Sequence, residues 1–477
     1  MKSRKDQVQA YFFVLGRLVA AVTHGKPEAL QSPSRRLATG TVFGVLLAGV
    51  LMAVFGILGL FVPATADKSW QQAGTIVMDK TTGARYIFLD GQLRPVLNYS
   101  SARLAAGTSG SGSVVSVSPG SLSGVPVGQP IGIAGAPDSL PPANKLDGGP
   151  WTVCVQPPGS DPATKGPAVT VLLSRPPSPA IGDEQAMLVS TSDGVPFMVW
   201  KGKRFRLSGR GVKASLGYGN ARTLAVTPAW LNPIPQGPDI DVPGIPGIGQ
   251  PGPAIEGRQS RIGQIYEVRN PAIGTDQLYL LRRDGMALLS RTGAALLLAA
   301  PQTQQAYPGE AVLPVQAGPA ALTDVPTSAA PDPFAELPPS PPQLLVPPPD
   351  SFPCMRFEYS AAGAPAPVAA LLPAAQIVAA SVPTAGHAAG AAADRVAIPV
   401  GSGVLARELP APGAVPGPVY LITEVGTKYP LADADVVTAL GYSPSSAVSI
   451  PAQLLSLLPS GPLLSADGAR RAQPVKP

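Results

Sequence analysis

The chain has 477 residues and a net charge of +6, and only 13% of its residues are charged. Pro (59) and Gly (52) make up about 23% of it, which excludes a helical bundle or coiled coil, because those folds need dense helix formers and charge. Residues 1–40 hold seven Lys and Arg against two acidic residues, whereas the remainder is nearly neutral. Nucleic-acid binding needs clustered basic residues that neutralise phosphates, so we expect no nucleic-acid partner for the large C-terminal portion.

The N-terminal head, residues 1–40, contains a predicted amphipathic helix. Within residues 6–24, Tyr11, Phe12, Leu15 and Leu18 belong to a stripe with i, i+3, i+4, i+7 spacing, which is typical of such a helix. Two interpretations stay open. The helix lies on anionic lipid, or it is a docking helix whose contact residues for a cytoplasmic partner are these four.

Residues 41–62 form an apolar run of 22 residues without a charge. As a helix this run spans about 33 Å, enough for a hydrocarbon core of roughly 30 Å. Arg35 and Arg36 precede it, so the positive-inside rule places the N-terminus in the cytoplasm and the C-terminal portion outside. The alternative is a signal peptide cleaved at Ala64–Ala66, but the apolar core of a signal peptide is only about 7–15 residues long. The sequence therefore predicts a single-pass protein of the plasma membrane.

Four later segments share one pattern, an apolar strand, a Gly-containing turn and a second strand. They are YIFLDGQLRPVL (86–97), PFMVWKGKRFRL (196–207), LYLLRRDGMALL (278–289) and VYLITEVGTKYPL (419–431). Asp90–Gly91 and Asp284–Gly285 are predicted hairpin turns, because Asp and Gly tolerate a positive φ. A short helix follows, for which Gly217 and Gly441 are predicted C-terminal caps, and then a Pro-led segment. Each unit is too small to bury much surface alone, so the units are expected to pack together.

These patterns divide the chain into a head, a span, four repeats, a central domain made of two segments, two linkers and a tail. The predicted ranges are 1–40 (head), 41–62 (span), 68–135 (repeat 1), 145–190 (first central segment), 191–240 (repeat 2), 241–258 (Pro/Gly linker), 259–328 (repeat 3), 329–350 (Pro-rich linker), 351–400 (second central segment), 415–466 (repeat 4) and 467–477 (tail). Both linkers are expected to be semi-rigid spacers, because proline lacks a backbone donor and favours extended structure.

The chain has two cysteines, Cys154 and Cys354, one in each segment of the predicted central domain. On the predicted outer side of the membrane disulfides persist, which favours a bridge between them. Such a bridge closes a loop of about 200 residues and contributes on the order of 5 kcal/mol in the chain-entropy model. The alternative is two buried free thiols.

No motif in the sequence predicts catalysis, a metal or a cofactor. His24 and His387, the two histidines, lie on opposite sides of the predicted membrane, and two cysteines with one outer histidine do not match a structural zinc site. A phosphate-binding loop needs G-x-x-x-x-G-K-[ST], and the sequence contains neither GKS nor GKT. The carboxylate pairs Asp183–Glu184 and Asp433/Asp435 are interpreted as solvated turns.

The chain resembles the EccB family, a membrane component of type VII (ESX) secretion systems in actinobacteria. The resemblance rests on MKSRKDQVQAYFFVLGRLVAAV, RRLATGTVFGVLLAGVLMAVFG, residues 74–104, residues 449–465 and the cysteine pair. It implies a β-rich α+β extracytoplasmic region, with a central domain, four small β-hairpin/helix repeat domains in pseudo-symmetry, and a Cys154–Cys354 disulfide. It also implies EccC-like ATPase, EccD-like and EccE-like partners, and self-association outside the membrane.

The leading hypothesis is therefore a structural, non-catalytic subunit of the secretion complex that exports small helical WXG100-like proteins. Some members of the family are labelled ATPases, so an extracytoplasmic nucleotide hydrolase that uses ATP is the first alternative, although no residue can be nominated for it. A membrane-anchored module that binds the cell wall is the second alternative.

Overall fold

A computed structural model describes residues 4–25, 33–61, 68–108, 113–160, 166–174, 179–272, 274–323, 325–358, 366–379, 381–384, 392–411 and 413–473. The chain divides into two compact units. The first comprises Met1–Trp70 and Val117–Ser123, and the second comprises Gln71–Ser116 and Gly124–Pro477. Each unit is described by itself.

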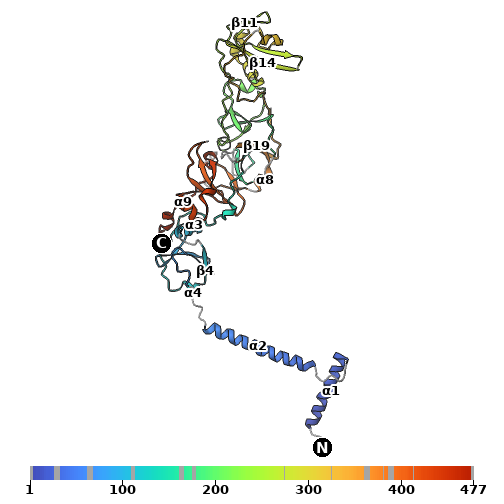
Figure 1. Ribbon diagram of the computed structural model, residues 1–477, viewed down its shortest axis with the longest axis vertical. Coiled ribbons are helices and arrows are strands. Elements are labelled where there is room, and N and C mark those ends of the chain that lie inside the picture. Colours follow the sequence, from blue (N-terminus) through green and yellow to red (C-terminus); the bar gives the residue numbers. More distant parts are fainter. Residues whose placement is uncertain are drawn as a thin grey trace. The chain divides into compact units, whose positions relative to one another are not determined.

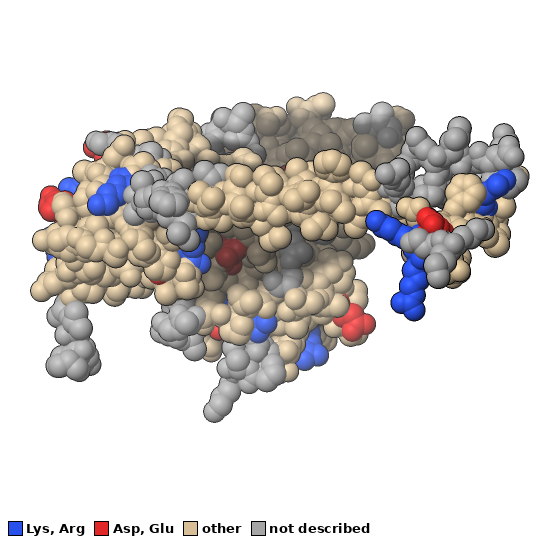
Figure 2. All heavy atoms as spheres, turned by 90° about the horizontal axis from the view of Figure 1, so that it is seen from below, with Lys and Arg blue, Asp and Glu red and all other residues tan. Residues whose placement is uncertain are grey.

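The first unit is helical, with α1 (Arg4–His24), α2 (Pro33–Phe61) and the short α4 (Pro119–Leu122). Within α2, Leu37–Ile57 has a mean hydropathy of 2.3, and in the described portion of the chain it is the one stretch of helix long and apolar enough to cross a membrane. Figure 2 shows α2 as a tan rod without charged side chains along its length. The helix begins before the predicted residue 41 because Pro33 fits the first helical position, where no backbone N–H is needed.

The second unit is β-rich and contains four sheets with one common strand order, which we call modules 1 to 4. In each module the first three strands are consecutive neighbours that run antiparallel to one another, and a fourth strand pairs with the first. In modules 2, 3 and 4 this last pairing is parallel. The strands of module 1 are β1 (Ile76–Asp79), β2 (Arg85–Leu89), β3 (Gln92–Pro95) and β4 (Val114–Val117), and those of module 2 are β7 (Gln185–Ser190), β8 (Pro196–Trp200), β9 (Lys203–Arg206) and β10 (Leu224–Ala225). Those of module 3 are β13 (Ile265–Asn270), β14 (Thr275–Arg282), β15 (Gly285–Leu289) and β16 (Val315–Ala317), and those of module 4 are β22 (Val404–Leu409), β23 (Val419–Ile422), β24 (Lys428–Leu431) and β25 (Val448–Pro451).

The hairpin turn of module 1 has the predicted residues, but that of module 3 does not. Asp90 and Gly91 have φ values of 50° and 73°, as a two-residue turn of type I′ requires. In module 3, Arg282 pairs with Gly285, so the turn is Arg283–Asp284 and the prediction of Asp284–Gly285 is wrong by one residue. Gly285 serves packing instead, because a Cβ there would lie 2.0 Å from the Pro326 carbonyl oxygen.

Short helices follow the hairpins. They are α3 (Tyr99–Ala106), α5 (Val212–Ser215), α7 (Arg291–Leu298) and α9 (Ala434–Ala439). Three of them begin with a side chain that accepts a hydrogen bond from the backbone N–H three residues on, namely Asn98, Ser290 and Asp433. Gly217 and Gly441 follow the last turn of α5 and α9 with φ values of 84° and 93°, which is the predicted capping geometry.

A six-stranded central sheet has the strand order β19-β18-β5-β6-β21-β20. Its strands are β5 (Trp151–Gln156), β6 (Ala168–Leu173), β18 (Ser351–Glu358), β19 (Ala366–Pro373), β20 (Val382–Pro383) and β21 (Arg395–Ala397). The predicted boundary at residue 190 differs from the structure, because β7 pairs with β8 and so belongs to module 2. The middle of β7, Ala186–Val189, is an uninterrupted apolar run that fits either sheet.

The two Pro-rich stretches are not free spacers. In the first, Ile245 and Ile255 are buried, and β11 (Pro251–Ile255) pairs with β12 (Arg258–Arg261). In the second, β17 (Gln343–Leu344) pairs with β7. The residues between the prolines keep their N–H donors and apolar side chains, so these stretches pack and pair. The remaining elements are α6 (Pro228–Leu231), α8 (Ala374–Val378), α10 (Ala452–Leu455), α11 (Ala466–Arg470), η1 (Ala143–Lys145), η2 (Pro301–Ala306), η3 (Pro319–Leu322) and η4 (Pro444–Ser446).

The buried core shows which modules pack together. One cluster joins the central sheet with modules 2 and 4, and it includes Trp151, Trp230 and Leu454. A second cluster joins modules 2 and 3, and a third joins modules 1 and 4. Modules 1 and 4 come from opposite ends of the sequence, and their helices α3 and α9 are neighbours (Figure 1).

Candidate functional site

The described portion of the chain has no arrangement typical of catalysis. It contains no group of three or more His, Cys, Asp or Glu residues that would hold a metal ion. The Asp183 carboxylate pairs with Lys201 Nζ at 2.9 Å, and Asp433 caps α9 by accepting a hydrogen bond from the Val436 N–H at 2.8 Å. Both therefore have structural roles. His387 and the alternative cleavage site at 64–66 lie outside the described residues.

The predicted docking residues lie on α1 and are exposed. The exposed fractions are 64% for Tyr11, 65% for Phe12, 45% for Leu15 and 61% for Leu18. Phe13, which the spacing did not single out, is also 65% exposed, and the Arg17 guanidinium lies 5.8 Å from its ring centroid. Apolar surface of this extent on a helix is usually covered by lipid or protein.

Arg35 and Arg36, the predicted membrane-flanking residues, lie in the first turn of α2. Their side chains are outside the described portion. They come immediately before Leu37–Ile57, and their role as membrane-flanking residues stays a prediction.

A disulfide joins Cys154 and Cys354, as expected from the sequence. Cys154 lies on β5 and Cys354 on β18, and the two residues are direct partners in this antiparallel pair. Both are fully buried, among Leu172, Phe352 and Ile377. The bond thus ties together two segments 200 residues apart, one from each half of the chain.

Modules 2 and 4 contact the central sheet through equivalent turn glycines. A Cβ on Gly202 would lie 2.2 Å from the Pro367 carbonyl oxygen on β19, and one on Gly426 would lie 2.3 Å from Val396 Cγ1 on β21. No residue with a Cβ fits either place without movement. The two glycines therefore set how closely each module approaches the sheet.

Two residues after each glycine, a basic side chain supports the Pro-led helix of the same module. Arg204 Nη1 donates to the Leu231 carbonyl at the end of α6 at 3.2 Å, and Lys428 Nζ donates to the Leu455 carbonyl at the end of α10. Burial lowers the pKa of Arg204, and it lowers the pKa of Lys428 against an opposing effect of Glu408. A cation at a helix C-terminus satisfies free carbonyls and offsets their partial negative charge.

In modules 2 and 4, a tyrosine holds a connecting segment that comes from another part of the chain. Tyr218 of module 2 donates from its hydroxyl to the Pro342 carbonyl at 2.6 Å, and Tyr442 of module 4 donates to the Pro141 carbonyl at 2.8 Å. Pro342 follows module 3 and Pro141 follows module 1. Burial raises the pKa of Tyr218 to about 12 and also raises the pKa of Tyr442. The tyrosines of the SLGY and ALGY motifs thus hold the segments that follow modules 3 and 1.

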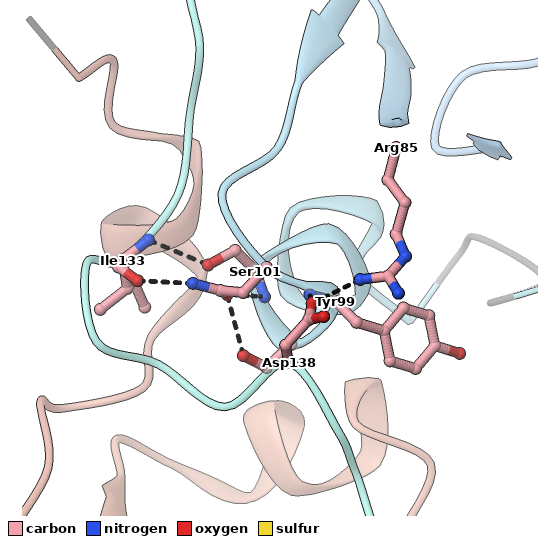
Figure 3. Close-up of polar contacts among 7 residues, drawn as sticks. Arg85, Tyr99, Ser101, Ile133 and Asp138 are labelled. Atoms are coloured by element: carbon pink, nitrogen blue, oxygen red, sulfur yellow. Dashed lines mark hydrogen bonds and ion pairs between the residues drawn. The ribbon is translucent and has the colours of Figure 1, made fainter. Parts of the chain in front are cut away.

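A polar network fixes the segment that follows module 1 against α3 (Figure 3). The Asp138 carboxylate accepts hydrogen bonds from Arg85 and from the Tyr99 N–H. Asn98 Nδ2 donates to the Ile133 carbonyl at 2.8 Å, and the Ile133 N–H donates to Ser101 Oγ at 2.9 Å. Nothing in the local sequence pattern predicts these contacts, because their partners lie more than 30 residues apart.

Two cavities of about 290 and 300 Å³ lie in the second unit. The first is lined by Asp183, Lys201, Gly202 and β19, and the second by Arg282, Arg283, Asp284 and prolines of both Pro-rich stretches. Arg282 donates to the Ala330 and Pro331 carbonyls, and Asp284 accepts from Ser328. These charged groups already serve the fold, and no nucleophile with a neighbouring base lines either cavity.

Comparison with known proteins agrees with this arrangement. The family described as type VII secretion system ESX-1, transport TM domain B (EccB) matches residues 2–475. The chain is 29% identical to the ESX-3 secretion system ATPase EccB3 of Mycobacterium tuberculosis, over 97% of this chain and 88% of that protein. It is 28% identical to ESX-2 secretion system ATPase EccB2 of the same species, over 100% and 96%.

Solved structures are similar over the same extent. A chain of an intact ESX-5 inner membrane complex superposes with a TM-score of 0.69 at 23% identity, over 100% of this chain and 96% of that one. A chain of an EccB3 dimer from the ESX-3 core complex superposes with a TM-score of 0.69 at 26% identity, over 83% and 100%.

Proposed function

The chain belongs to the EccB family of type VII secretion systems, and we propose that it is a structural subunit of a type VII secretion membrane complex. The observation that carries this proposal is the bridged central sheet with its interlocked modules. The disulfide, the buried glycine contacts and the tyrosine links all hold segments far apart in sequence together. Such bonds stabilise a scaffold and do not create a reactive group.

In this proposal α2 anchors the protein with its N-terminus in the cytoplasm. The basic residues before the span and the disulfide after it both support that orientation, because disulfides persist outside the cytoplasm. The four modules are repeat domains arranged in pseudo-symmetry about the central sheet. Their common strand order and the equivalent pairs Gly202/Gly426 and Tyr218/Tyr442 support this.

The proposed partners are EccC-like, EccD-like and EccE-like membrane subunits, and the outer region self-associates. The exposed apolar residues of α1 supply a cytoplasmic contact surface for one of these subunits. The assembled complex exports small helical WXG100-like proteins. No cofactor is required for the role of this chain.

The test is affinity purification of the tagged full-length protein from membranes in mild detergent, followed by sizing and mass spectrometry. Co-elution in a megadalton particle with an FtsK-like ATPase and a multi-span subunit is the expected result. Replacing Tyr11, Phe12, Leu15 and Leu18 by Ser should release the cytoplasmic partner, whereas Gln9→Ser on the same helix should not. A reproducible lone monomer or dimer contradicts the proposal.

ATP hydrolysis is the second candidate, because the similar mycobacterial proteins are named ATPases. Purified full-length protein with metal-dependent turnover of ATP, abolished by one point substitution that preserves folding, would favour it. If the ATP turnover separates from this protein and co-purifies with a contaminating ATPase in further purification steps, this second candidate is rejected. Sedimentation with purified cell wall tests the remaining alternative, a wall-binding anchor.

A further inference from the structure

The segment Ser465–Gln473, which we call the strap, leaves module 4 and binds module 1. The predicted range 467–477 treated most of it as a tail. In the structure it contains α11, and Ala469 is fully buried in the cluster shared by modules 1 and 4. The faint red ribbon of this C-terminal segment lies beside Ile133, in the segment that follows the strands of module 1, in Figure 3.

The strap donates hydrogen bonds to a backbone carbonyl at the end of helix α3 in module 1. Arg470 donates from Nε and Nη2 to the Ala105 carbonyl, both at 3.2 Å. Ala105 is in the last turn of α3, where carbonyls have no partner inside the helix, so Arg470 caps α3 from a position 365 residues away.

The strap also forms an isolated β-bridge at the edge of module 1. Ile131 already pairs with Val96 on one side, and on its other side it forms an antiparallel bridge with Ala472. The Gln473 N–H donates to the Pro130 carbonyl at 2.8 Å, and Gln473 Nε2 donates to the Gly132 carbonyl at 2.7 Å. Without the strap, this edge of module 1 would present unpaired backbone groups.

We propose that the strap is a latch that completes module 1, so that this module becomes stable only after residue 473 has been made. Module 1 follows the membrane span directly in the sequence, yet its last contacts come from residues 341 and 365 positions later. The stability of module 1, which follows the membrane span in the sequence, thereby depends on synthesis of the chain through residue 473. This inference rests on the contacts of the strap and does not depend on the proposed function.

Hydrogen exchange of the full-length protein in detergent tests the latch. A chain ending after Leu464 is compared with a control ending after Gln473, which keeps the strap. The expected result is an exchange at least tenfold faster in Tyr99–Ala106 and Pro130–Ile133 for the shorter chain only. Exchange in β8 and β9 of module 2 should be unchanged, and a synthetic peptide of residues 465–473 should restore protection in module 1.

A point substitution covers the case in which the shorter chain does not fold. Arg470→Met should speed exchange in α3 in the same direction and by a smaller factor, whereas Asp467→Ala, at another position of the same helix, should leave it unchanged. Wild-type protection of both module 1 segments in the shorter chain would overturn the proposal. Equal loss of protection in modules 1 and 2 in both the shorter chain and Arg470→Met would overturn it too, because the strap would then belong to the general core.

Discussion

Tyr442 and Pro141 lie 301 positions apart in the sequence, yet the Tyr442 hydroxyl donates a hydrogen bond to the Pro141 carbonyl in a buried contact. Tyr218 makes the same contact with Pro342 in the other pair of modules. The tyrosines belong to modules 2 and 4, which pack on the central sheet. The prolines follow modules 3 and 1, which pack on modules 2 and 4 respectively. The pairing therefore interleaves the two halves of the chain.

Tyr442→Phe should weaken the contact between module 4 and the segment that follows module 1. The substitution leaves the buried Pro141 carbonyl without its donor, which costs about 1–2 kcal/mol. Hydrogen exchange should become faster around residues 137–141 and in α9. Tyr279→Phe is the matched control, because the Tyr279 hydroxyl donates to Gln277 in an exposed contact. Equal effects of the two substitutions would mean that the link contributes nothing.

Alkaline pH should destabilise the second unit. Burial raises the pKa of Tyr218 to about 12, whereas an unfolded tyrosine has its pKa near 10. The stabilisation from the neutral phenol is fully present below pH 10, and it is lost as the pH rises from there through 12, because the unfolded state releases the proton first. The melting temperature should fall over this interval, and Tyr218→Phe should reduce its slope. An unchanged slope would show that the phenol ionises equally easily in both states.

Gly202→Ala should be more harmful than Gly91→Ala. Both glycines lie in hairpin turns with a positive φ, 71° and 73°, so each substitution introduces backbone strain of about 1 kcal/mol. Only Gly202 has a neighbour in the way, the Pro367 carbonyl, whereas nothing lies within 4 Å of a Cβ on Gly91. We expect an additional loss of about 1–3 kcal/mol for Gly202→Ala. Thermal melting of both variants measures the difference, and equal melting temperatures would refute the close contact.

Removing the disulfide should lower stability without changing the fold. In the chain-entropy model, a bridge across 200 residues stabilises by about 5 kcal/mol. Replacing both Cys154 and Cys354 by Ala avoids an unpaired thiol, and the variant should unfold at a clearly lower temperature. The wild-type protein treated with reductant should approach the same value. Equal stability of the variant and the oxidised wild type would contradict this account.

Several elements were predictable from local sequence alone. The uncharged run in 41–62 predicted a span, because about 20 apolar residues are what a bilayer requires. The Asp90–Gly91 turn and the capping glycines Gly217 and Gly441 were recognisable because a positive φ strongly favours glycine and tolerates aspartate. The two cysteines allowed one pairing, since no other partner exists in the sequence.

The contacts between modules were not predictable in this way. The sequence of β7 does not say whether it pairs with β6 or β8, and the prolines around Ile245 suggested a spacer although Ile245 is buried. Residues 467–477 were predicted to be a tail, because the sequence of a five-residue helix that contains an Arg does not indicate which distant segment it binds.

The sequence by itself determined the membrane span, the hairpins and the cysteine pair of this protein, because each depends on neighbouring residues or on composition. Only the tertiary structure decided which modules pair, what the Pro-rich stretches bury and where residues 465–473 bind. Those outcomes depend on buried surface and backbone hydrogen bonds between segments hundreds of residues apart, and no local pattern encodes such a partner.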